Sequence, residues 1–222
     1  MKEHAIILAG GSGLRIGGET PKQFIDLGGT SMLEMSIAKF RHYSDDIQLV
    51  VAIHPDFKDL WTNMVQRNPQ WPEIEWVDGG KERYHSVKNA LDSLPQEGLV
   101  AIHDAARPNV TTGLIQRSFD LARKSGSSIP VWPVSDSLRH VQGDQHQAVL
   151  RSEYVTVQTP QVFDLALIKR AYQQNFSDEF TDDASVVEKM GEQVSLVQGS
   201  PGNTKITSKP DLDFLRFQLL KH

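Results

Sequence analysis

The sequence predicts an α/β fold, with a doubly wound, mostly parallel sheet and helices on both of its faces. Short apolar runs at residues 6–9, 47–53 and 99–103 are long enough for buried strands of a parallel sheet and too short for core helices. Segments with helical spacing of apolar residues separate these runs, so strands and helices alternate. No repeat, low-complexity tract or linker interrupts residues 1–222, and we expect them to form a single domain.

The first half of the chain shows this alternation clearly. Ser31 and Glu34 form a capping-box pattern, and the apolar residues that follow at helical spacing predict the first helix. Aromatic and aliphatic residues between 57 and 65 fall on one helical face, as is typical of a helix packed on a core. The other elements expected in this half are a strand at 74–77 and helices at 83–94 and 112–124.

The second half contains a segment that does not fit the alternation. Residues 128–134 are extended, and their two prolines indicate an edge strand or one that leaves the sheet. The polar residues 139–151, centred on Gly143, predict a hairpin with little to bury, so we expect an arm over about 135–155. The residues alone leave open whether this arm packs on a partner subunit or is an exposed flap. The remaining elements expected are strands at 154–157 and 194–197, a helix entered from 159–163, a helix capped by Thr181 and a last helix from Pro210.

Composition excludes several classes of protein. The formal net charge of -5 provides no overall basic field for nucleic acid. Cysteine is absent, which removes disulfides, thiolate chemistry and zinc–thiolate sites. The apolar run near the N-terminus is too short for a signal-peptide core, and no later run approaches the length of a membrane span. We therefore expect a cytoplasmic protein with neither a nucleic-acid nor a membrane partner.

A glycine-rich segment directly after the first strand is the strongest sign of a ligand site. Gly10, Gly11 and Gly13 allow positive φ and a close approach of the backbone, so that N–H groups can converge on an anion. Arg15 and Lys22 add two positive charges to the same loop. This combination suits a polyphosphate better than a single carboxylate.

The spacing of this loop differs from the two common phosphate-binding patterns. In a dinucleotide fingerprint counted from Gly11, Ile16 stands where the third glycine is required. In the Walker pattern, Glu19 stands where lysine is required. The loop is therefore of a third kind, and a nicotinamide dehydrogenase is disfavoured.

Polar side chains also follow other predicted strands. The segments 79–86 and 104–107 lie at strand ends, and Lys205 follows a later strand. The carboxyl ends of strands in a doubly wound sheet share one crevice, so we expect these segments to meet. The cations available there favour a substrate with several phosphates, and they are Arg15, Lys22, Arg83, Arg107 and Lys205.

The acidic and histidine residues near these strand ends allow more than one interpretation. Asp104 could bind a substrate hydroxyl or a hydrated Mg²⁺, or it could form a structural ion pair with Arg107. Asp182 and Asp183 could bind a metal, but the first turn of a helix explains them equally well. His103 ends an apolar strand and is more typical of a satisfied core histidine than of a ligand.

These residues are compatible with nucleotidyl transfer. If the acceptor is a phosphomonoester, no general base is needed, because its second pKa of about 6 leaves it mostly dianionic at neutral pH. The task is then to bring two anions together and to stabilise charge on the α-phosphoryl oxygens, which fixed cations and a divalent metal can do.

Six motifs, which follow one another along the chain, resemble the 2-C-methyl-D-erythritol 4-phosphate cytidylyltransferase family. Together they span nearly the whole chain, and they are Ala9–Gly17 with Pro21–Phe24, Gly79–Val87, His103–Pro108, Gln158–Phe163, Thr181–Ser185 and Asn203–Thr207. The resemblance implies a Rossmann-like nucleotidyltransferase fold with a protruding β-arm for dimerisation. It also implies transfer of CMP from CTP to a polyol phosphate, 2-C-methyl-D-erythritol 4-phosphate, with Mg²⁺ as cofactor, in a homodimer.

The resemblance assigns roles by motif. Arg15 and Lys22 would stabilise the pentacoordinate α-phosphate, while Lys205 and the partner's Arg151 would position the acceptor phosphate. The nucleotide would be held by Ala9, Gly10, Gly11, Gly80 and Ser86. The acceptor pocket would be lined by Asp104, Arg107, Ser137 and Thr181.

This chain departs from the family pattern at three places. Many members have alanine in place of Gly10, and Ala-Gly-Gly is shared with sugar nucleotidyltransferases, so the loop alone does not establish cytosine. Gly202 stands where an acidic residue often precedes Asn203, so no side chain is assigned as a metal ligand. Ser137 stands where members often have threonine, and it keeps the hydroxyl.

Two alternatives to this function remain. Ribitol 5-phosphate cytidylyltransferase is similar in most of the same motifs, although 103–108 and 181–185 resemble the methylerythritol enzyme more. A non-catalytic nucleotide-binding regulatory protein is the alternative from another class. The presence of Arg15, Lys22 and Lys205 together argues against it.

Overall fold

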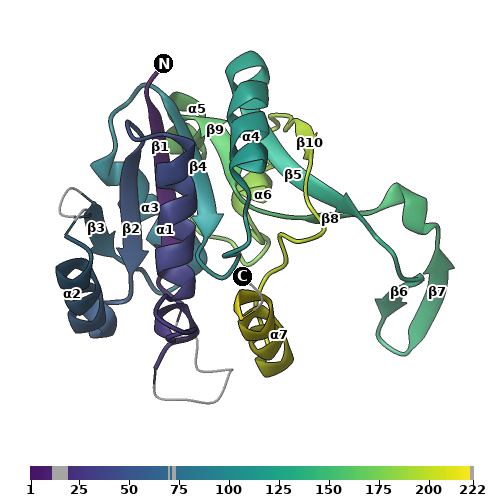
Figure 1. Ribbon diagram of the computed structural model, residues 1–222. Helices are drawn as coiled ribbons and strands as arrows, with labels where there is room; N and C mark the ends of the chain where they lie inside the picture. Colours follow the sequence, from purple (N-terminus) through teal and green to yellow (C-terminus); the bar gives the residue numbers. More distant parts are fainter. Residues whose placement is uncertain (12–19, 70, 72–73, 221–222) are drawn as a thin grey trace.

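The computed structural model describes residues 1–11, 20–69, 71 and 74–220, and it places a mixed sheet between layers of helices (Figure 1). The strand order is β10-β5-β9-β4-β1-β2-β3, with β8 paired to β5 outside this path. β1, β2, β3 and β4 are mutually parallel, as are β5 and β10, whereas β8 and β9 run antiparallel to their neighbours. The strands of this sheet are β1 (Glu3–Ala9), β2 (Gln48–Ile53), β3 (Glu75–Asp78), β4 (Leu99–Asp104), β5 (Ser127–Pro133), β8 (Val155–Val157), β9 (Gln161–Asp164) and β10 (Leu196–Gln198).

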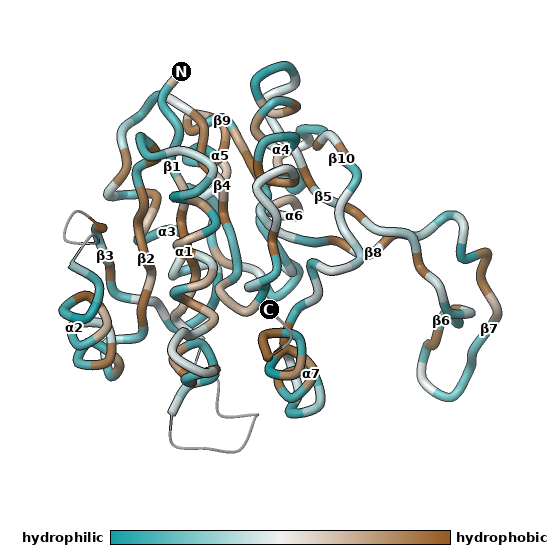
Figure 2. Tube along the Cα trace, in the orientation of Figure 1, coloured by the Kyte–Doolittle hydropathy of each residue, from teal (hydrophilic) through white to brown (hydrophobic). Residues whose placement is uncertain are grey.

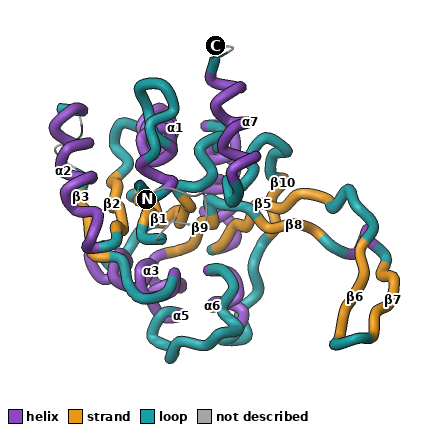
Figure 3. Tube along the Cα trace, turned by 90° about the horizontal axis from the view of Figure 1, so that it is seen from below, coloured by secondary structure: helices purple, strands orange, loops and turns teal. Residues whose placement is uncertain are grey.

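Helices cover both faces of the sheet, which confirms the predicted α/β class. Side chains alternate across a strand, so Ile7 of β1 packs in the core with α1, α2 and α4, whereas Ile6 packs with α3, α5 and α6. Figure 3 shows α1 and α2 on one side of the sheet and α3, α5 and α6 on the other. The helices are α1 (Met32–Tyr43), α2 (Lys58–Arg67), α3 (Arg83–Ser93), α4 (Thr112–Ser125), α5 (Leu165–Ala171), α6 (Asp183–Glu188) and α7 (Lys209–Leu219), with short 3₁₀ turns η2 (Lys22–Phe24), η3 (Pro55–Phe57) and η4 (Arg151–Glu153).

The hydrophobic pattern explains why the central strands are buried. β2 is hydrophobic along nearly its whole length (Figure 2), and β4 is buried at every position. A continuous apolar run of this kind is typical of a parallel strand that is covered on both faces. None of the helices in the described part of the chain is long and apolar enough to cross a membrane.

The structure corrects the prediction for residues 159–163. They do not simply lead into a helix, because Gln161–Asp164 forms β9, an antiparallel strand between β4 and β5. The strand is short and ends at Asp164, whose side chain caps α5 by accepting hydrogen bonds from the backbone N–H groups of Ala166 and Leu167. A four-residue strand that runs directly into a helix has little periodicity of its own, and this hid it in the sequence.

The segment predicted as an edge strand or one that leaves the sheet does leave it. β5 begins inside the sheet, where it pairs with β9 and β10. It then continues with β8 out of the body of the molecule (Figure 1). At its far end, β6 (Leu138–Gln142) and β7 (Gln145–Val149) form a separate two-stranded sheet around a turn in which Gly143 has a φ of 59°. The predicted hairpin is confirmed, and nearly all of its residues are exposed.

The starts of the last two helices differ slightly from the prediction. The N-cap of α6 is Asp182 rather than Thr181, and its side chain accepts a hydrogen bond from the backbone N–H of Ser185 at 2.9 Å. The N-cap of α7 is Ser208, which leaves Pro210 within the first turn. Threonine, aspartate and serine all cap well, so a run of such residues does not say which one begins the helix.

Candidate active site

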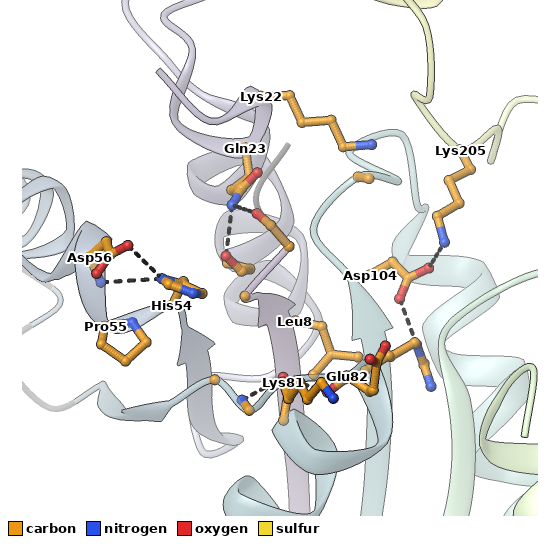
Figure 4. A pocket seen from close by; sticks show the side chains of 18 of the residues that line it. Leu8, Lys22, Gln23, His54, Pro55, Asp56, Lys81, Glu82, Asp104 and Lys205 are labelled. Atoms are coloured by element: carbon orange, nitrogen blue, oxygen red, sulfur yellow. Dashed lines mark hydrogen bonds and ion pairs between the residues drawn. The ribbon is translucent and has the colours of Figure 1, made fainter. Parts of the chain in front are cut away.

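A cleft of about 940 Å³ lies at the carboxyl ends of the parallel strands β1 to β4 (Figure 4). It brings together the polar segments that follow these strands, as the sequence predicts for a doubly wound sheet. The residues that line it are Leu8–Gly11, Lys22, Gln23, His54–Asp56, Gly79–Arg83, Ser86, Asp104, Ala106, Lys205 and Thr207.

One wall of the cleft, which we call the glycine wall, is formed by Gly10, Gly11, Gly79 and Gly80. Its backbone segments approach so closely that a Cβ on Gly79 would lie 3.2 Å from the backbone of Ile53 and 3.3 Å from the Cα of Gly10. Gly10 and Gly11 are not among the described glycines with positive φ. At Gly10 the need for glycine comes from space, because a Cβ there would lie 3.3 Å from the Oγ of Ser86, whereas a Cβ on Gly11 would meet no described atom within 4 Å. Of the two reasons that the sequence analysis gives for these glycines, positive φ is therefore wrong at Gly10 and Gly11, while Gly13 lies outside the described residues.

Ser86 fixes the second turn of the glycine wall. Its Oγ accepts a hydrogen bond from the backbone N–H of Gly80 at 3.0 Å and donates to the carbonyl of Glu82 at 3.2 Å. The turn between β3 and α3 is therefore tied to the first turn of α3. Gly80 and Ser86, which the sequence selects as nucleotide-binding residues, thus lie together in the cleft.

Gln23 holds the end of β1, a role that the sequence analysis missed. Its side chain is buried, and its Nε2 donates to the carbonyl oxygens of Ala9 at 2.7 Å and Gly11 at 2.9 Å. The adjacent Lys22 extends its Nζ to the carbonyl of Ile206 at 2.6 Å, on the far side of the cleft (Figure 4). Arg15, the other cation expected in this loop, lies outside the described residues.

The opposite wall, which we call the charged wall, is centred on Asp104 at the end of β4. Its Oδ2 lies 2.8 Å from the Nζ of Lys205, and its Oδ1 lies 3.3 Å from the Nε of Arg83. Burial would raise the pKa of Asp104, but Arg83 and Lys205 outweigh it and hold this pKa far below the usual range. Asp104 is therefore ionised at neutral pH.

Arg83 lines the cleft, as the sequence predicts, but carboxylates of the protein hold its guanidinium. Its Nη1 and Nη2 donate to the two carboxylate oxygens of Asp183 at 2.8 and 2.6 Å. Burial alone would lower the pKa of Arg83, but Asp183 and Asp104 raise it well above its usual value. All three nitrogens of the guanidinium thus face carboxylates of the protein.

His103 is the satisfied core histidine that the sequence predicts. Its Nδ1 lies 3.1 Å from the hydroxyl of Thr159, and its Nε2 lies 3.2 Å from the carbonyl of Arg107. The carbonyl of Arg107 can only accept, so Nε2 carries the proton and Nδ1 of the neutral ring accepts from the Thr159 hydroxyl, which itself accepts from the backbone N–H of Asp104. Burial lowers the pKa of His103 to about 4, so the ring is neutral.

The ion pair considered between Asp104 and Arg107 is replaced by other contacts. Arg107 donates to the carbonyl oxygens of Asn203 at 2.8 Å and Val157 at 3.1 Å. It therefore joins the loop after β10 to the end of β8, the strand that follows the arm. Asp104 instead forms ion pairs with Arg83 and Lys205.

The comparison with protein families agrees with this geometry. From residue 3 to residue 221, the chain matches the family model described as IspD, 2-C-methyl-D-erythritol 4-phosphate cytidylyltransferase. The chain belongs to this family. It is therefore a nucleotidyltransferase of the cytidylyltransferase type, as the resemblance of its motifs implies.

Relatives and solved structures from the IspD family match over nearly their full length. The enzyme of that name from Bacteroides thetaiotaomicron is 43% identical over 212 residues, which cover 96% of this chain and 97% of the relative. The one from Porphyromonas gingivalis is 39% identical over 219 residues, 98% of each chain. The crystal structure from Thermus thermophilus has a TM-score of 0.79 at 32% identity over 100% of both chains. The 4-diphosphocytidyl-2C-methyl-D-erythritol synthase of Anaerococcus prevotii has a TM-score of 0.84 at 28% identity, over 99% of this chain and 98% of that one.

Four of the residues selected by the resemblance to the IspD family do not line the cleft in this single chain. One of them is Arg107, which the carbonyl oxygens of Asn203 and Val157 hold outside it. Ser137 is exposed at the base of the arm, just before β6. Arg151 is exposed in η4, where its guanidinium donates to the carbonyl of Ser135. Thr181 is exposed directly before the cap of α6. Their roles would need a second chain or a bound substrate.

The residues that the structure describes include no group of three or more histidine or acidic side chains placed to hold a metal. Asp182 caps α6 and also accepts from the Nε2 of Gln161 at 2.8 Å, while Asp183 is paired with Arg83. The start of the helix, one of the two interpretations kept open for these aspartates, accounts for them.

Proposed function

We propose that this protein transfers CMP from CTP to 2-C-methyl-D-erythritol 4-phosphate and releases pyrophosphate, in the non-mevalonate synthesis of isoprenoid precursors. The observation that carries the proposal is the family match over residues 3–221, because it includes every strand end that lines the cleft. The curated relatives compared above bear the name of this activity.

For this reaction the protein must position the two substrates and supply positive charge. An oxygen of the acceptor phosphate forms a bond to the α-phosphorus of CTP, and the bond from that phosphorus to the bridging oxygen of the β-phosphate breaks. The electron pair leaves with pyrophosphate. The acceptor is already a dianion at neutral pH, so no base has to remove a proton. The protein must offset the repulsion between the two anions and the charge that develops in the transition state.

The glycine wall suits the nucleotide. Gly10, Gly11 and Gly80, together with Ala9 and Ser86, would bind it through backbone groups in the space that the missing side chains leave. Arg15 and Lys22 would stabilise the α-phosphate. Lys22 supports this role because its ammonium already lies between the two walls, at the carbonyl of Ile206.

The charged wall suits the acceptor. Lys205 would bind the acceptor phosphate with the partner's Arg151. Asp104 accepts hydrogen bonds at the floor of this wall and, with Arg107, Ser137 and Thr181, would face the polyol. The arm supports a homodimer, because Val141 and Leu150 are apolar and about two-thirds exposed, at 65% and 63%. An arm that packs on a second chain would cover them and bring Arg151 to the neighbouring cleft.

Magnesium would enter this site with the nucleotide. Mg²⁺ is bound by oxygen ligands and often by substrate phosphates, and Asp104, the acid at the centre of the charged wall, is already neutralised by two cations. The donor set in the described part of the cleft therefore fits MgCTP as the substrate, with the metal held mainly by the triphosphate. When bound, the metal would offset phosphate charge. We propose the cytoplasm as the site of this reaction.

The test is pyrophosphate release with MgCTP and two acceptors measured in parallel. We expect 2-C-methyl-D-erythritol 4-phosphate to be strongly preferred over ribitol 5-phosphate. Preference for ribitol 5-phosphate would keep the chemistry and change the acceptor. If neither acceptor leads to pyrophosphate release while the protein still binds CTP, the proposal is contradicted and a non-catalytic nucleotide-binding protein is favoured.

A further inference from the structure

We propose that Asp183 is a positioning residue: through Arg83 it sets the orientation of Asp104 and, with it, the place of Lys205 on the charged wall. The inference rests on the proposed function, because it concerns the side of the cleft where the acceptor would bind. Asp183 does not line the cleft and would not touch either substrate. Its effect would pass entirely through side chains of the protein.

Several independent contacts fix the position of Asp183. The residue is fully buried and is the first residue of α6, directly after the cap Asp182. The hydroxyl of Tyr172 donates to its Oδ1 at 2.6 Å. Gln161 of β9 ties the helix start to the sheet, since its Nε2 donates to Asp182 and its Oε1 accepts from the backbone N–H of Ala184 at 3.0 Å. Both the backbone and the carboxylate of Asp183 are thus held from the core.

This fixed carboxylate determines the orientation of Arg83. Two parallel hydrogen bonds from Nη1 and Nη2 to one carboxylate fix the plane of the guanidinium. In that plane the remaining Nε–H points to Oδ1 of Asp104, at 3.3 Å. The second oxygen of Asp104 is then left for Lys205, whose ammonium lies 2.8 Å away. Each contact in this series therefore fixes the direction in which the next hydrogen bond or ion pair can form.

The degree of burial shows which end of the series is fixed and which end acts. Along the series, the side chain is 0% exposed at Asp183, 30% at Arg83, 11% at Asp104 and 44% at Lys205, so the series begins at a buried carboxylate and ends at its most exposed member. A flexible, half-exposed lysine has many conformations to choose from, and a buried anion at its tip reduces them. A charge held in this way needs little reorganisation when an anion arrives, and this is what a site for a phosphate requires.

The first test is Asp183→Asn, which keeps the size of the side chain and an oxygen for Tyr172 but removes the charge. We expect kcat/KM for the acceptor to fall by about ten- to a hundredfold, the loss seen when an outer partner that orients a ligand is removed. The KM for CTP should stay within about twofold, because the glycine wall is untouched. Asp183→Glu keeps the charge on a longer stem and should give an intermediate value.

The matched control is Tyr84→Phe. Tyr84 is next to Arg83 in α3, is buried, and donates to the carbonyl oxygens of Tyr172 and Gln174 at 3.0 and 2.5 Å. Its loss should lower the melting temperature without changing the kinetics of the acceptor. If Asp183→Asn, or Asp183→Glu should the first variant not fold, affects the two substrates equally and only in proportion to its loss of stability, the proposal is overturned.

A crystal structure of Asp183→Asn separates this proposal from the proposed function. We expect Lys205 to have left Asp104, and an unchanged pair at 2.8 Å would overturn the inference whatever the activity is. If the wild-type enzyme is silent with both acceptors, the proposed function fails while this structure still decides the role of Asp183. If the wild-type enzyme is active, the double variant Asp183→Asn/Asp104→Asn should have nearly the same kcat/KM for the acceptor as Asp104→Asn alone, because both changes act on the same series of contacts.

Discussion

The two walls of the cleft are built in opposite ways. The glycine wall has almost no side chains, and its shape is set by how closely the backbones at Gly10 and Gly79 approach. The charged wall consists of long side chains whose positions depend on ion pairs, with Asp104 between two cations. The first wall is therefore damaged by adding atoms, and the second by removing charge. A site that joins a nucleotide to a phosphorylated polyol can use one wall for shape and the other for electrostatics.

Lys22 gives the largest expected effect, because it belongs to the loop of the glycine wall and reaches the charged wall at Ile206. Lys22→Ala should lower kcat by orders of magnitude, since the loss of a transition-state charge stabiliser costs roughly 3 to 4 kcal/mol. Steady-state kinetics at saturating MgCTP would measure it, and circular dichroism would show that the fold is kept. Near-normal turnover would show that Lys22 takes no part in the mechanism and that its contact with the charged wall has no role in catalysis.

The second prediction asks whether the charged wall is completed by another chain. Neither Lys22→Ala nor Arg151→Ala should be active alone. If the partner's Arg151 serves each cleft, a one-to-one mixture should regain activity in about a quarter of all sites, by random pairing of a two-fold dimer. The assay is pyrophosphate release after subunit exchange, with exchange verified separately by native mass spectrometry. Exchange without any regain would mean that each cleft is built within one chain.

The third prediction concerns the core directly behind the charged wall. The pKa of His103 is about 4 in the folded protein against about 6.5 in the unfolded chain, so the unfolded state takes up the proton first. The stability that comes from the neutral ring is fully present above about pH 6.5 and is lost as the pH falls toward 4, up to about 3 kcal/mol. Urea unfolding over this range would measure it.

The control for this pH dependence is His103→Gln. Glutamine can donate to the carbonyl of Arg107 and accept from Thr159, but it does not titrate. The free energy of unfolding of this variant should vary less between about pH 6.5 and 4 than that of the wild type. Parallel curves for the two proteins would assign the acid sensitivity to other groups.

The sequence predicts the glycine wall better than the charged wall, and the reason is physical. Gly10 and Gly80 stand at strand ends that apolar runs reveal, so a local pattern is enough to select them. The partner of Arg83 is Asp183, one hundred residues away, and no local pattern connects them. Sequence reasoning therefore counted Arg83 as a substrate-binding cation, whereas the tertiary fold uses it inside the protein.

The same distinction explains the errors in secondary structure. Long periodic helices such as α1 and α4 were predictable from their caps and apolar faces. β9 has four residues and owes its existence to pairing with β4 and β5, which are distant in the chain. The arm was predictable because Gly143 marks its turn, whereas the contact that we propose for it with a second chain has no local pattern in the sequence.

The smallest effect is expected on the glycine wall, where two neighbouring glycines differ in their surroundings. A Cβ on Gly80 would lie 2.2 Å from the Cβ of His85, so α3 would have to shift. A Cβ on Gly11 would meet nothing within 4 Å in the part of the chain that the structure describes. We expect Gly80→Ala to lower the free energy of unfolding by about 1 to 3 kcal/mol, the usual cost of overpacking, and also to raise the KM for CTP.

Gly11→Ala separates the shape of the wall from the stability of the fold. Its melting temperature should match the wild type, because the added methyl group meets no atom of the described residues within 4 Å. Its KM for CTP should still rise, because Gly11 lines the cleft and the methyl group would occupy space meant for the nucleotide. Equal melting temperatures for both alanine variants would show that the wall yields easily. A normal KM for CTP in Gly11→Ala would place the nucleotide elsewhere in the cleft, and shape would then no longer distinguish this wall from the charged one.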